Sequence, residues 1–547
     1  MIGAGKKITG CLCLLLLIAE VFSQYSEGKY FISFTDKDNS PYSVDKPEEF
    51  LSERAIQRRS RYNIPVTVQD LPVNPHYIDS IRNAGLTVVN PSKWFNAVTV
   101  VADSARAVLL DSIKQFSFVQ SLEKTYPYTA KNGKNPAEKA MNETAYNNAV
   151  VDEYYGGGYG QIAMLNGHYL HMMGYKGKGV IIAVTDAGFN NVNTLEAFDS
   201  LRLQNRLLAI KDFVDYDTNV FHSSTHGLKV LSIISANVPG FFVGAAPEAD
   251  IVLLRTENPA NEYLIEEDNW VAGAEYADSI GADIINISLG YSIFYDTAQS
   301  HTYLDMDGNT TRISIGADIA SSKGMLVVVS AGNEGDDAWK YITAPADADS
   351  VLTVGAVDNN RMYAGFSSIG PTCDGRIKPD VAALGNGNII LTSGGLLTMG
   401  SGTSYAAPVI SGLAACLWQA YPHLNNQEII SLLHSFGSQA DNPDNLLGYG
   451  LPDFKKAFNF YNEAFYSLYP NPYESELFLD FYSGKNQSLT YKVYDLLGKQ
   501  VAAGSYPLTA NNHYTVNLSS LQYLSRGIYI LSVSFNGNLY KHKIFKS

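Results

Sequence analysis

The stretch Gly179-Val-Ile-Ile-Ala-Val-Thr-Asp-Ala-Gly-Phe189 decides the fold that we expect for this chain. Its first seven residues are mostly apolar without alternation, as in a strand that is covered on both faces. Similar apolar runs stand at 251–254, 284–287 and 325–329, with helical patterns such as 226–234 and 271–280 between them. Alternating strands and helices predict an α/β domain with a doubly wound, mostly parallel sheet. Ligands in such a domain bind beyond the carboxyl ends of the strands.

Three residues with the chemistry of nucleophilic catalysis stand at such places. Asp186 ends the first run, and His226 opens a helical pattern. Ser404 lies where Gly400-Ser-Gly-Thr-Ser-Tyr-Ala-Ala-Pro408 leads into an apolar helix. Singly, each has an ordinary structural explanation: a turn aspartate, a structural histidine, a helix N-cap. Together they follow the chain order Asp, His, Ser of one known serine-hydrolase arrangement.

This combination makes a serine hydroxyl reactive. A neutral imidazole accepts the hydroxyl proton during attack, and a carboxylate fixes the imidazole tautomer and stabilises the imidazolium. Ser404 at a helix N-terminus also has backbone N–H groups and a favourable dipole near the developing negative charge. Asn333, which follows the 325–329 run, would donate its side-chain amide to the oxyanion together with the N–H of Ser404.

Eight short blocks between 161 and about 460 carry a resemblance. They are Val184-Thr-Asp-Ala-Gly188, His226-Gly-Leu228, Val243-Gly-Ala-Ala-Pro247, Asn286-Ile-Ser-Leu-Gly290, Phe366-Ser-Ser-Ile-Gly-Pro371, Lys378-Pro-Asp380, Gly402-Thr-Ser-Tyr-Ala-Ala-Pro408 and Gly448-Tyr-Gly450. In this order they resemble the subtilisin-like serine peptidases. Ala187, Leu228 and Tyr405 depart from the usual residues of that family, but they flank the three candidates without replacing them.

The resemblance implies a serine endopeptidase that is made as a zymogen and hydrolyses proteins or peptides through a covalent acyl-enzyme. Asp186 would orient the base, His226 would act as general base and then acid, Ser404 would be the nucleophile, and Asn333 would complete the oxyanion hole. It also implies two substrate-binding strands, which are Ser288-Leu289-Gly290 and Ser330-Ala331-Gly332. The first would pair with the substrate backbone, and the second would wall the primary side-chain pocket. Its small residues favour a pocket open to large apolar side chains.

No cofactor is required by this chemistry, and we assign no metal ligands. Structural Ca²⁺ is frequent among subtilisin-like peptidases, and Asp305-Met-Asp-Gly-Asn309 clusters oxygen ligands. Gly316 stands where an EF-hand needs its acidic twelfth residue, so we interpret this stretch as a polar turn.

Three other functions are alternatives. A catalytically weak or dead subtilisin fold would act as a cell-surface binding protein, and an esterase would use the same Ser404. A sedolisin-type acid peptidase uses Glu in place of the histidine. His226 instead predicts a neutral or alkaline optimum, because the imidazole must be unprotonated to act as a base.

The first 23 residues have the layout of a secretory signal peptide. Lys6 and Lys7 precede the apolar run 11–18, and Val21-Phe-Ser23 offers a cleavage point before Gln24. The run is shorter than the roughly 20 residues that span a bilayer. A buried N-terminal helix is the alternative, and we expect no transmembrane segment in the rest of the chain.

Residues 24–127 have a β-α-β-β-α pattern, with strands expected at 29–34, 86–89 and 97–101 and helices at 47–61 and 104–115. By the resemblance, this α+β module is an inhibitory prodomain that templates folding, blocks the cleft with its C-terminal tail and is removed by self-cleavage. The cut would lie in an exposed linker, 128–160. We interpret the basic segment 54–61, with its Arg58-Arg59 pair, as a solvated helix face and not as a processing site.

Short β-rich runs separated by Gly, Asn and Ser clusters fill residues 464–547, after a peptidase domain at 161–463. They predict a β-sandwich. Leu468-Tyr-Pro-Asn-Pro472, Val493-Tyr-Asp-Leu-Leu-Gly498 and Gly527-Ile-Tyr529 resemble the C-terminal sorting domain of type IX secretion cargo. The resemblance implies export across a Gram-negative outer membrane to the cell surface or outside, with the type IX machinery as partner. A carbohydrate- or protein-binding sandwich is the alternative.

Composition excludes some classes of protein. An apolar share of 46 % is ordinary for globular chains and excludes global disorder. With 39 basic and 54 acidic residues, the net charge of −15 is the opposite of a nucleic-acid binder's. Removal of the signal peptide leaves only Cys373 and Cys416, too few for a disulfide framework. We expect a monomer.

Overall fold

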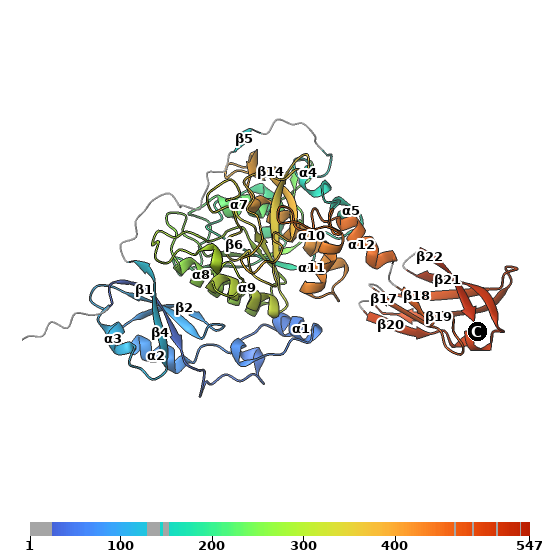
Figure 1. Ribbon diagram of the computed structural model, residues 1–547, viewed down its shortest axis with the longest axis horizontal. Helices are drawn as coiled ribbons and strands as arrows, with labels where there is room; N and C mark the ends of the chain where they lie inside the picture. The colour runs from blue at the N-terminus through green and yellow to red at the C-terminus, as the bar shows by residue number, and fades with distance from the viewer. Residues whose placement is uncertain are drawn as a thin grey trace, which may run out of the picture.

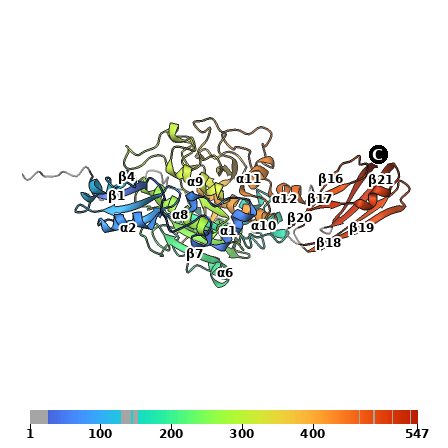
Figure 2. The same cartoon turned by 90° about the horizontal axis from the view of Figure 1, so that it is seen from below.

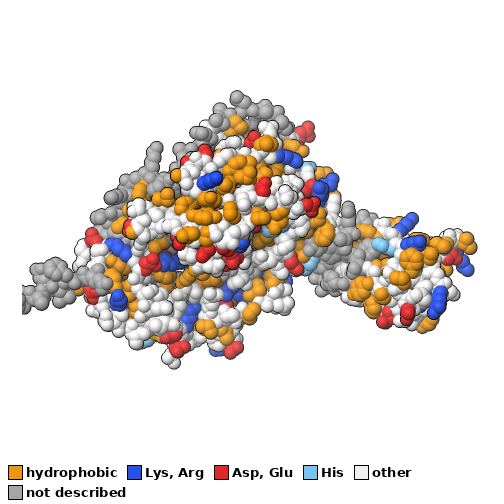
Figure 3. Space-filling view, in the orientation of Figure 1, with side chains coloured by type: hydrophobic (Ala, Val, Ile, Leu, Met, Phe, Trp, Pro, Cys, Tyr) orange, Lys and Arg blue, Asp and Glu red, His pale blue; other side chains and the backbone are white. Residues whose placement is uncertain are grey.

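The computed structural model describes residues 25–127, 143–145, 152–463, 466–483, 486–509, 512–535 and 538–547. The expected signal peptide and most of the expected linker lie outside these residues. Two views at right angles show three domains in a row: the N-terminal module, the large central domain and the C-terminal domain (Figures 1 and 2). Among the described helices, none has the length and apolar character needed to cross a membrane. Acidic and basic side chains are interspersed over the face shown in Figure 3.

The central domain is built on a nine-stranded sheet, in the order β5-β15-β14-β13-β12-β11-β6-β10-β7. The strands are β5 (Thr144–Ala145), β6 (Ile181–Asp186), β7 (Leu207–Asp212), β10 (Asp250–Arg255), β11 (Ile284–Ile287), β12 (Leu326–Ser330), β13 (Leu352–Asp358), β14 (Val381–Leu391) and β15 (Leu397–Ser401). All neighbouring pairs are parallel except the two that β15 makes, at one edge. This confirms the predicted doubly wound α/β architecture.

Helices cover both faces of the sheet. The helices packed directly on it are α7 (His226–Ser235) and α10 (Thr403–Ala420) on one face, and α8 (Ile265–Ile280) and α9 (Arg312–Ser322) on the other. Side chains of β6 alternate between the two cores, because Ile182 and Val184 pack with α7 and α10 while Ala183 packs with α8. Because both faces of these strands are covered, their apolar residues run consecutively and do not alternate with polar ones. Smaller elements are α4 (Tyr159–Ala163), α5 (His168–Met172), α6 (Asp199–Leu203), β8 (Asn237–Val238), β9 (Phe242–Val243), α11 (Asn426–Ser435) and α12 (Phe454–Glu463).

Residues 152–160, which the sequence placed in an exposed linker, pack against the central domain. Gly156 has a positive φ of 55°, and a Cβ there would lie 2.0 Å from the carbonyl oxygen of Phe241. Tyr155 is only 6 % exposed and belongs to the core on the α10 side. The glycines that suggested an open linker therefore permit close backbone approach.

The N-terminal module is an antiparallel sheet in the order β2-β3-β1-β4 with two helices on its own core and a third, α1, away from it. Its elements are β1 (Gly28–Phe34), α1 (Glu53–Arg61), α2 (Pro75–Asn83), β2 (Thr87–Ser92), β3 (Ala97–Ala102), α3 (Leu109–Ile113) and β4 (Val119–Pro127). The predicted helix 47–61 divides into a 3₁₀ turn, Pro47–Glu49, and α1, because Ser52 accepts the Ala55 N–H as an N-cap. The predicted helix 104–115 shortens to α3, and the sequence did not predict α2 or β4.

The expectation of a solvated face on α1 is wrong for two of its arginines. Arg58 and Arg59 are 3 % and 1 % exposed, and both bind the carboxylate of Asp278 on α8. The two arginines are therefore buried because they bind an acidic residue of another domain. The residue pattern within α1 contains no information about that acidic residue.

The C-terminal domain has two antiparallel sheets, β16-β17-β20 and β19-β18-β21-β22. The strands are β16 (Tyr466–Tyr469), β17 (Phe478–Ser483), β18 (Gln487–Tyr494), β19 (Gln500–Leu508), β20 (Asn512–Asn517), β21 (Gly527–Phe535) and β22 (Asn538–Lys546). One apolar cluster, which includes Leu479, Leu489 and Val533, draws side chains from both sheets. The predicted β-sandwich is thereby confirmed.

Candidate active site

Asp186 and His226 form a hydrogen-bonded pair at the carboxyl end of the sheet. Asp186 is the last residue of β6 and is 1 % exposed. His226 is the first residue of α7, and its Nδ1 lies 2.8 Å and 3.0 Å from the two carboxylate oxygens. One of these oxygens also accepts the N–H of Ala187 at 2.8 Å. The carboxylate is therefore fixed and holds the imidazole ring by its Nδ1 side.

Two glycines let the chain approach itself closely enough to make this pair. Gly188 has a φ of 152°, and a Cβ there would lie 2.1 Å from the carbonyl oxygen of His222. A Cβ on Gly227 would lie 2.5 Å from the carbonyl oxygen of Gly188. Ser224 Oγ accepts the N–H of His226 at 3.0 Å and so holds the start of α7. Gly188 and Gly227 therefore have no room for a side chain.

Ser404 is the second residue of α10 and is 5 % exposed. Pro408 stands four residues later and has no N–H, so the Ser404 carbonyl lacks its usual helical partner. That carbonyl accepts the hydroxyl of Ser288 at 3.0 Å instead. Asn286 donates to Ser288 Oγ at 3.0 Å and accepts from Ser411 Oγ at 2.8 Å. A buried polar chain thus ties the first turns of α10 to the end of β11.

Asn333 has its carboxamide held by Thr403, the residue before Ser404. Its Oδ1 accepts the backbone N–H of Thr403 at 2.9 Å and lies 3.0 Å from the Thr403 hydroxyl. That hydroxyl also contacts the carbonyl oxygen of Gly332 at 3.1 Å. With the oxygen engaged on α10, the NH₂ end is the one that the carboxamide presents as a donor. The sequence did not identify Thr403 as the residue that sets this orientation.

The two candidate substrate strands continue from the ends of neighbouring strands. Ser288, Leu289 and Gly290 follow β11, while Ser330 ends β12 and Ala331 and Gly332 follow it. A Cβ on Gly290 would lie 2.2 Å from Thr343 Oγ1, and one on Gly332 would lie 2.4 Å from Glu334 Oε2. The sequence also missed Glu334, whose carboxylate accepts Ser368 Oγ at 2.7 Å and whose pKa is raised by burial.

Candidate metal ligands have other partners. Among the described residues, one group of three metal-ligating side chains lies close together: Asp212, Asp215 and His222. The guanidinium of Arg255 pairs with both aspartates, at 2.6 Å for Asp212, and so places a cation there. In the 305–309 stretch, Asp305 accepts the N–H of Thr302, and Asp307 accepts that of Asn309 at 2.8 Å. This stretch has the hydrogen bonds of a polar turn.

Comparison with known proteins identifies all three domains. Residues 177–450, half of the chain, match the model of the subtilase family. Residues 29–142 match the peptidase S8 propeptide domain of Bacteroidota, and 467–547 match the secretion system C-terminal sorting domain. The propeptide and sorting domains indicate export through the type IX system, to the cell surface or outside.

The curated relatives match the central domain. The chain is 30 % identical to serine protease AprX of Bacillus subtilis over 305 residues, which cover 50 % of this chain and 65 % of AprX. It is 28 % identical to subtilisin DY of Bacillus licheniformis over 277 residues, covering 50 % of this chain and 89 % of that protein. The chain therefore spans just under two thirds of the length of AprX. Among solved structures, MycP1 from Mycobacterium smegmatis is 24 % identical, with a TM-score of 0.46 and coverage of 61 % of this chain and 92 % of MycP1. By the match over residues 177–450, the chain belongs to the subtilase family.

Proposed function

We propose that the protein is an exported serine endopeptidase that cleaves peptide bonds through an acyl-enzyme on Ser404. The observation that carries the proposal is the bonding of Asp186 to His226 Nδ1, at 2.8 Å, with the His226 ring 5.9 Å from the ring of Tyr405, the residue that follows Ser404 on α10. His226 Nε2 takes the hydroxyl proton as Ser404 attacks the carbonyl carbon. The carboxylate of Asp186 stabilises the imidazolium, which then protonates the leaving amine. Water, activated by His226 in the same way, then attacks the acyl-enzyme, and the carboxylic acid product leaves Ser404.

Charge that develops on the substrate oxygen meets donors on α10 and at Asn333. The N–H of Ser404 lies in the first turn of α10, and the Asn333 carboxamide is oriented by Thr403. Such donors act because they are already in place when the negative charge appears. Ser288-Leu289-Gly290 pairs with the peptide backbone, and Ser330-Ala331-Gly332 walls the side-chain pocket. This chemistry uses no metal, so we expect a chelator to leave the turnover number unchanged.

The N-terminal module is the inhibitory prodomain, and self-cleavage separates it from the peptidase domain. Thr144–Ala145 forms β5 on the edge of the central sheet, paired with β15 just before Ser404. The propeptide match ends at 142. Both observations support a cut within 128–143 that leaves β5 with the peptidase domain. Mass determination of the mature N-terminus tests this position, and a mature chain that still begins before residue 128 would exclude it.

The test of the activity is casein hydrolysis by the processed protein, together with labelling by a serine-directed fluorophosphonate. The prodomain of each chain is removed by a sequence-specific protease at a site inserted within 128–142, because a chain without Ser404 would not process itself. We expect Ser404→Ala to abolish both, while the matched variant Ser435→Ala, on the exposed end of α11, keeps both. A folded, processed wild type that neither cleaves nor labels would favour a cell-surface binding protein. Cleavage of esters without peptides would favour the esterase alternative.

A further inference from the structure

Residues 36–72 leave the prodomain sheet and return to it as a long arm that carries α1. Lys37 closes the base of this arm, since its Nζ donates to the carbonyl oxygens of Gln69, Leu71 and Lys93 at 3.1, 2.6 and 2.7 Å. Within the described part of the module, residues 25–127, the apolar core takes no side chain from 36–72. In both ribbon views α1 lies away from the β1–β4 sheet, against the central domain (Figures 1 and 2). The prodomain core therefore does not hold α1 in place.

The peptidase domain holds the arm through a surface that includes the residues just before β11 and β12, at the opposite ends of these strands from the substrate strands. We call this surface the arm site: Asp278, 281–283, Lys323, Gly324, Trp418 and Pro422. Arg54 donates to the carbonyl oxygens of Gly281 and Gly179, at 3.0 and 2.8 Å. At the other end of α1, Tyr62 stacks on Trp418 with ring centroids 6.3 Å apart and contacts the carbonyl oxygen of Pro422 at 3.2 Å.

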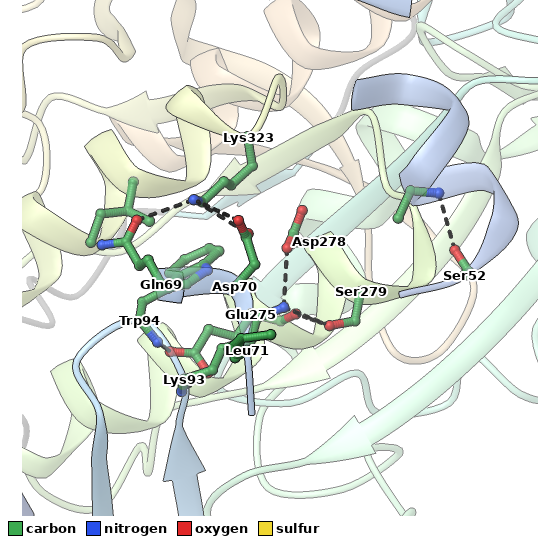
Figure 4. A network of polar contacts seen from close by, with 12 residues as sticks. Ser52, Gln69, Asp70, Leu71, Lys93, Trp94, Glu275, Asp278, Ser279 and Lys323 are labelled. Carbon is green, nitrogen blue, oxygen red and sulfur yellow. Dashed lines mark hydrogen bonds and ion pairs between the residues drawn. The ribbon is translucent and has the colours of Figure 1, made fainter. Parts of the chain in front are cut away.

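The centre of the arm site is one buried carboxylate. Asp278 is fully buried and pairs with Arg58 at 2.6 Å, with Arg59 at 3.0 Å and with Lys93 at 3.1 Å. Lys323 faces Asp70 of the arm at 3.3 Å, and Asp70 also accepts from Arg59. Figure 4 shows Asp278, Lys93, Asp70 and Lys323 converging at this junction. Burial raises the pKa of Asp278, but Lys93, Arg59 and Arg58 together hold it well below its usual range.

Such a junction depends on every member being present. A buried charge that loses its partner is strongly destabilising, because it cannot recover its hydration without exposure to water. Three basic side chains pair with Asp278. Two of them, Arg58 and Arg59, belong to the arm, and the third, Lys93, directly follows strand β2 of the prodomain sheet. A different junction joins the sheet to the N-terminal ends of α8 and α9, where Arg312 pairs with Glu123 of β4 and with Asp268. The prodomain sheet has a further contact with α8, where the Glu275 carboxylate accepts the Ser92 hydroxyl and the backbone N–H groups of Lys93 and Trp94. The arm is therefore one of several places where the prodomain is attached.

We propose that the arm site is a docking surface in its own right for an arginine-rich helix, and that this docking sets how long the cleaved prodomain stays on the peptidase domain. The proposal rests on the inhibitory role of the prodomain and adds the contact that controls its release. While docked, the arm also shields the Arg58-Arg59 pair, which is a target for proteases specific for basic residues once the arm lifts off.

The test measures binding and needs no activity. In a Ser404→Ala chain, a recognition sequence for a sequence-specific protease is inserted within 128–142 and cut, and the dissociation of the prodomain is followed by size-exclusion chromatography. The arm variant is Arg58→Gln with Arg59→Gln. The matched control is Arg61→Gln, which removes an exposed arginine from the same helix. We expect the arm variant to dissociate at least tenfold faster than the control.

A second variant covers the case in which the double substitution prevents folding. Tyr62→Ala removes the stacking on Trp418 without changing any charge, and we expect it also to shorten the lifetime of the complex. Dissociation rates within twofold of the Arg61→Gln control, in whichever of these variants folds, would overturn the proposal. Because Ser404 is already replaced, this outcome is independent of whether the protein is a peptidase.

Discussion

The backbone N–H of Thr403 donates to Asn333 Oδ1 over 2.9 Å, so the residue before the candidate nucleophile orients the candidate oxyanion donor. The two catalytic contributions proposed for this region thus depend on consecutive residues at the start of α10, Thr403 and Ser404. A change at Asn333 should affect the reaction without moving Asp186 or His226, which lie on β6 and α7.

We expect Asn333→Leu to lower kcat by about 100- to 1000-fold, the loss typical of one oxyanion donor, with little change in KM. The cause is electrostatic, because leucine has a similar volume but no donor for the negative oxygen. Labelling of Ser404 by a fluorophosphonate reports whether the nucleophile stays intact. A variant with unchanged kcat would remove Asn333 from the mechanism.

Asp186→Asn should reduce kcat by roughly four orders of magnitude at neutral pH, because an amide can hold the imidazole in the wrong tautomer and does not stabilise the imidazolium. The measurement is kcat on one peptide substrate, with a matched thermal unfolding curve. If the variant is as stable as the parent and as fast, Asp186 has no catalytic role.

Gly188→Ala should damage both folding and activity. The added Cβ would lie 2.1 Å from the His222 carbonyl oxygen, at a φ of 152° that disfavours a side chain. We expect a loss of stability of the order of 1–3 kcal/mol and a displaced His226. Gly160→Ala is the control, since a Cβ at that position of α4 meets nothing within 4 Å. Equal stability of the two variants would contradict the argument.

His171 should make the peptidase domain less stable in acid. Its Nδ1 lies 2.9 Å from Tyr155 Oη, and its Nε2 lies 2.9 Å from the Ala245 carbonyl oxygen, so the two contacts suit a neutral ring. Burial lowers its pKa from 6.5 to about 4. The unfolded chain therefore takes up a proton near pH 6.5 that the folded chain refuses until about pH 4, and stability falls across that window by roughly 3 kcal/mol.

The check is urea unfolding of the Ser404→Ala protein at pH 7.5 and pH 5, beside the same protein with His171→Gln. We expect the free energy of unfolding to drop less between these pH values in the glutamine variant. An identical drop would assign the acid sensitivity to other groups.

The central fold could be predicted because its signals are local. The apolar runs of β6, β10, β11 and β12 and the residues that end them can be recognised one strand at a time, and parallel topology then brings their ends together. Asp186 and His226 meet as the sequence predicted, because Asp186 ends a recognisable strand and His226 begins a recognisable helix.

The rest depended on contacts between distant segments. Arg58 and Arg59 have the sequence of an exposed helix face, but both are buried against Asp278. That residue stands more than 200 positions later in the chain, so the local sequence does not reveal the contact. The glycines of 156–160 suggested a linker, although Gly156 allows close contact with Phe241. The role of Thr403 in orienting Asn333 could likewise be found only once the loop after β12 was placed beside the start of α10.

Pro408 gives the start of α10 a consequence of its own. By removing one N–H, it turns the Ser404 carbonyl away from the helix ladder and onto Ser288, at 3.0 Å. Ser288 begins the strand proposed to pair with the peptide. In the proposed mechanism, a substrate bound to this strand would lie one hydroxyl away from the backbone of the proposed nucleophile, so that occupancy of the cleft would be coupled to the alignment of Ser404.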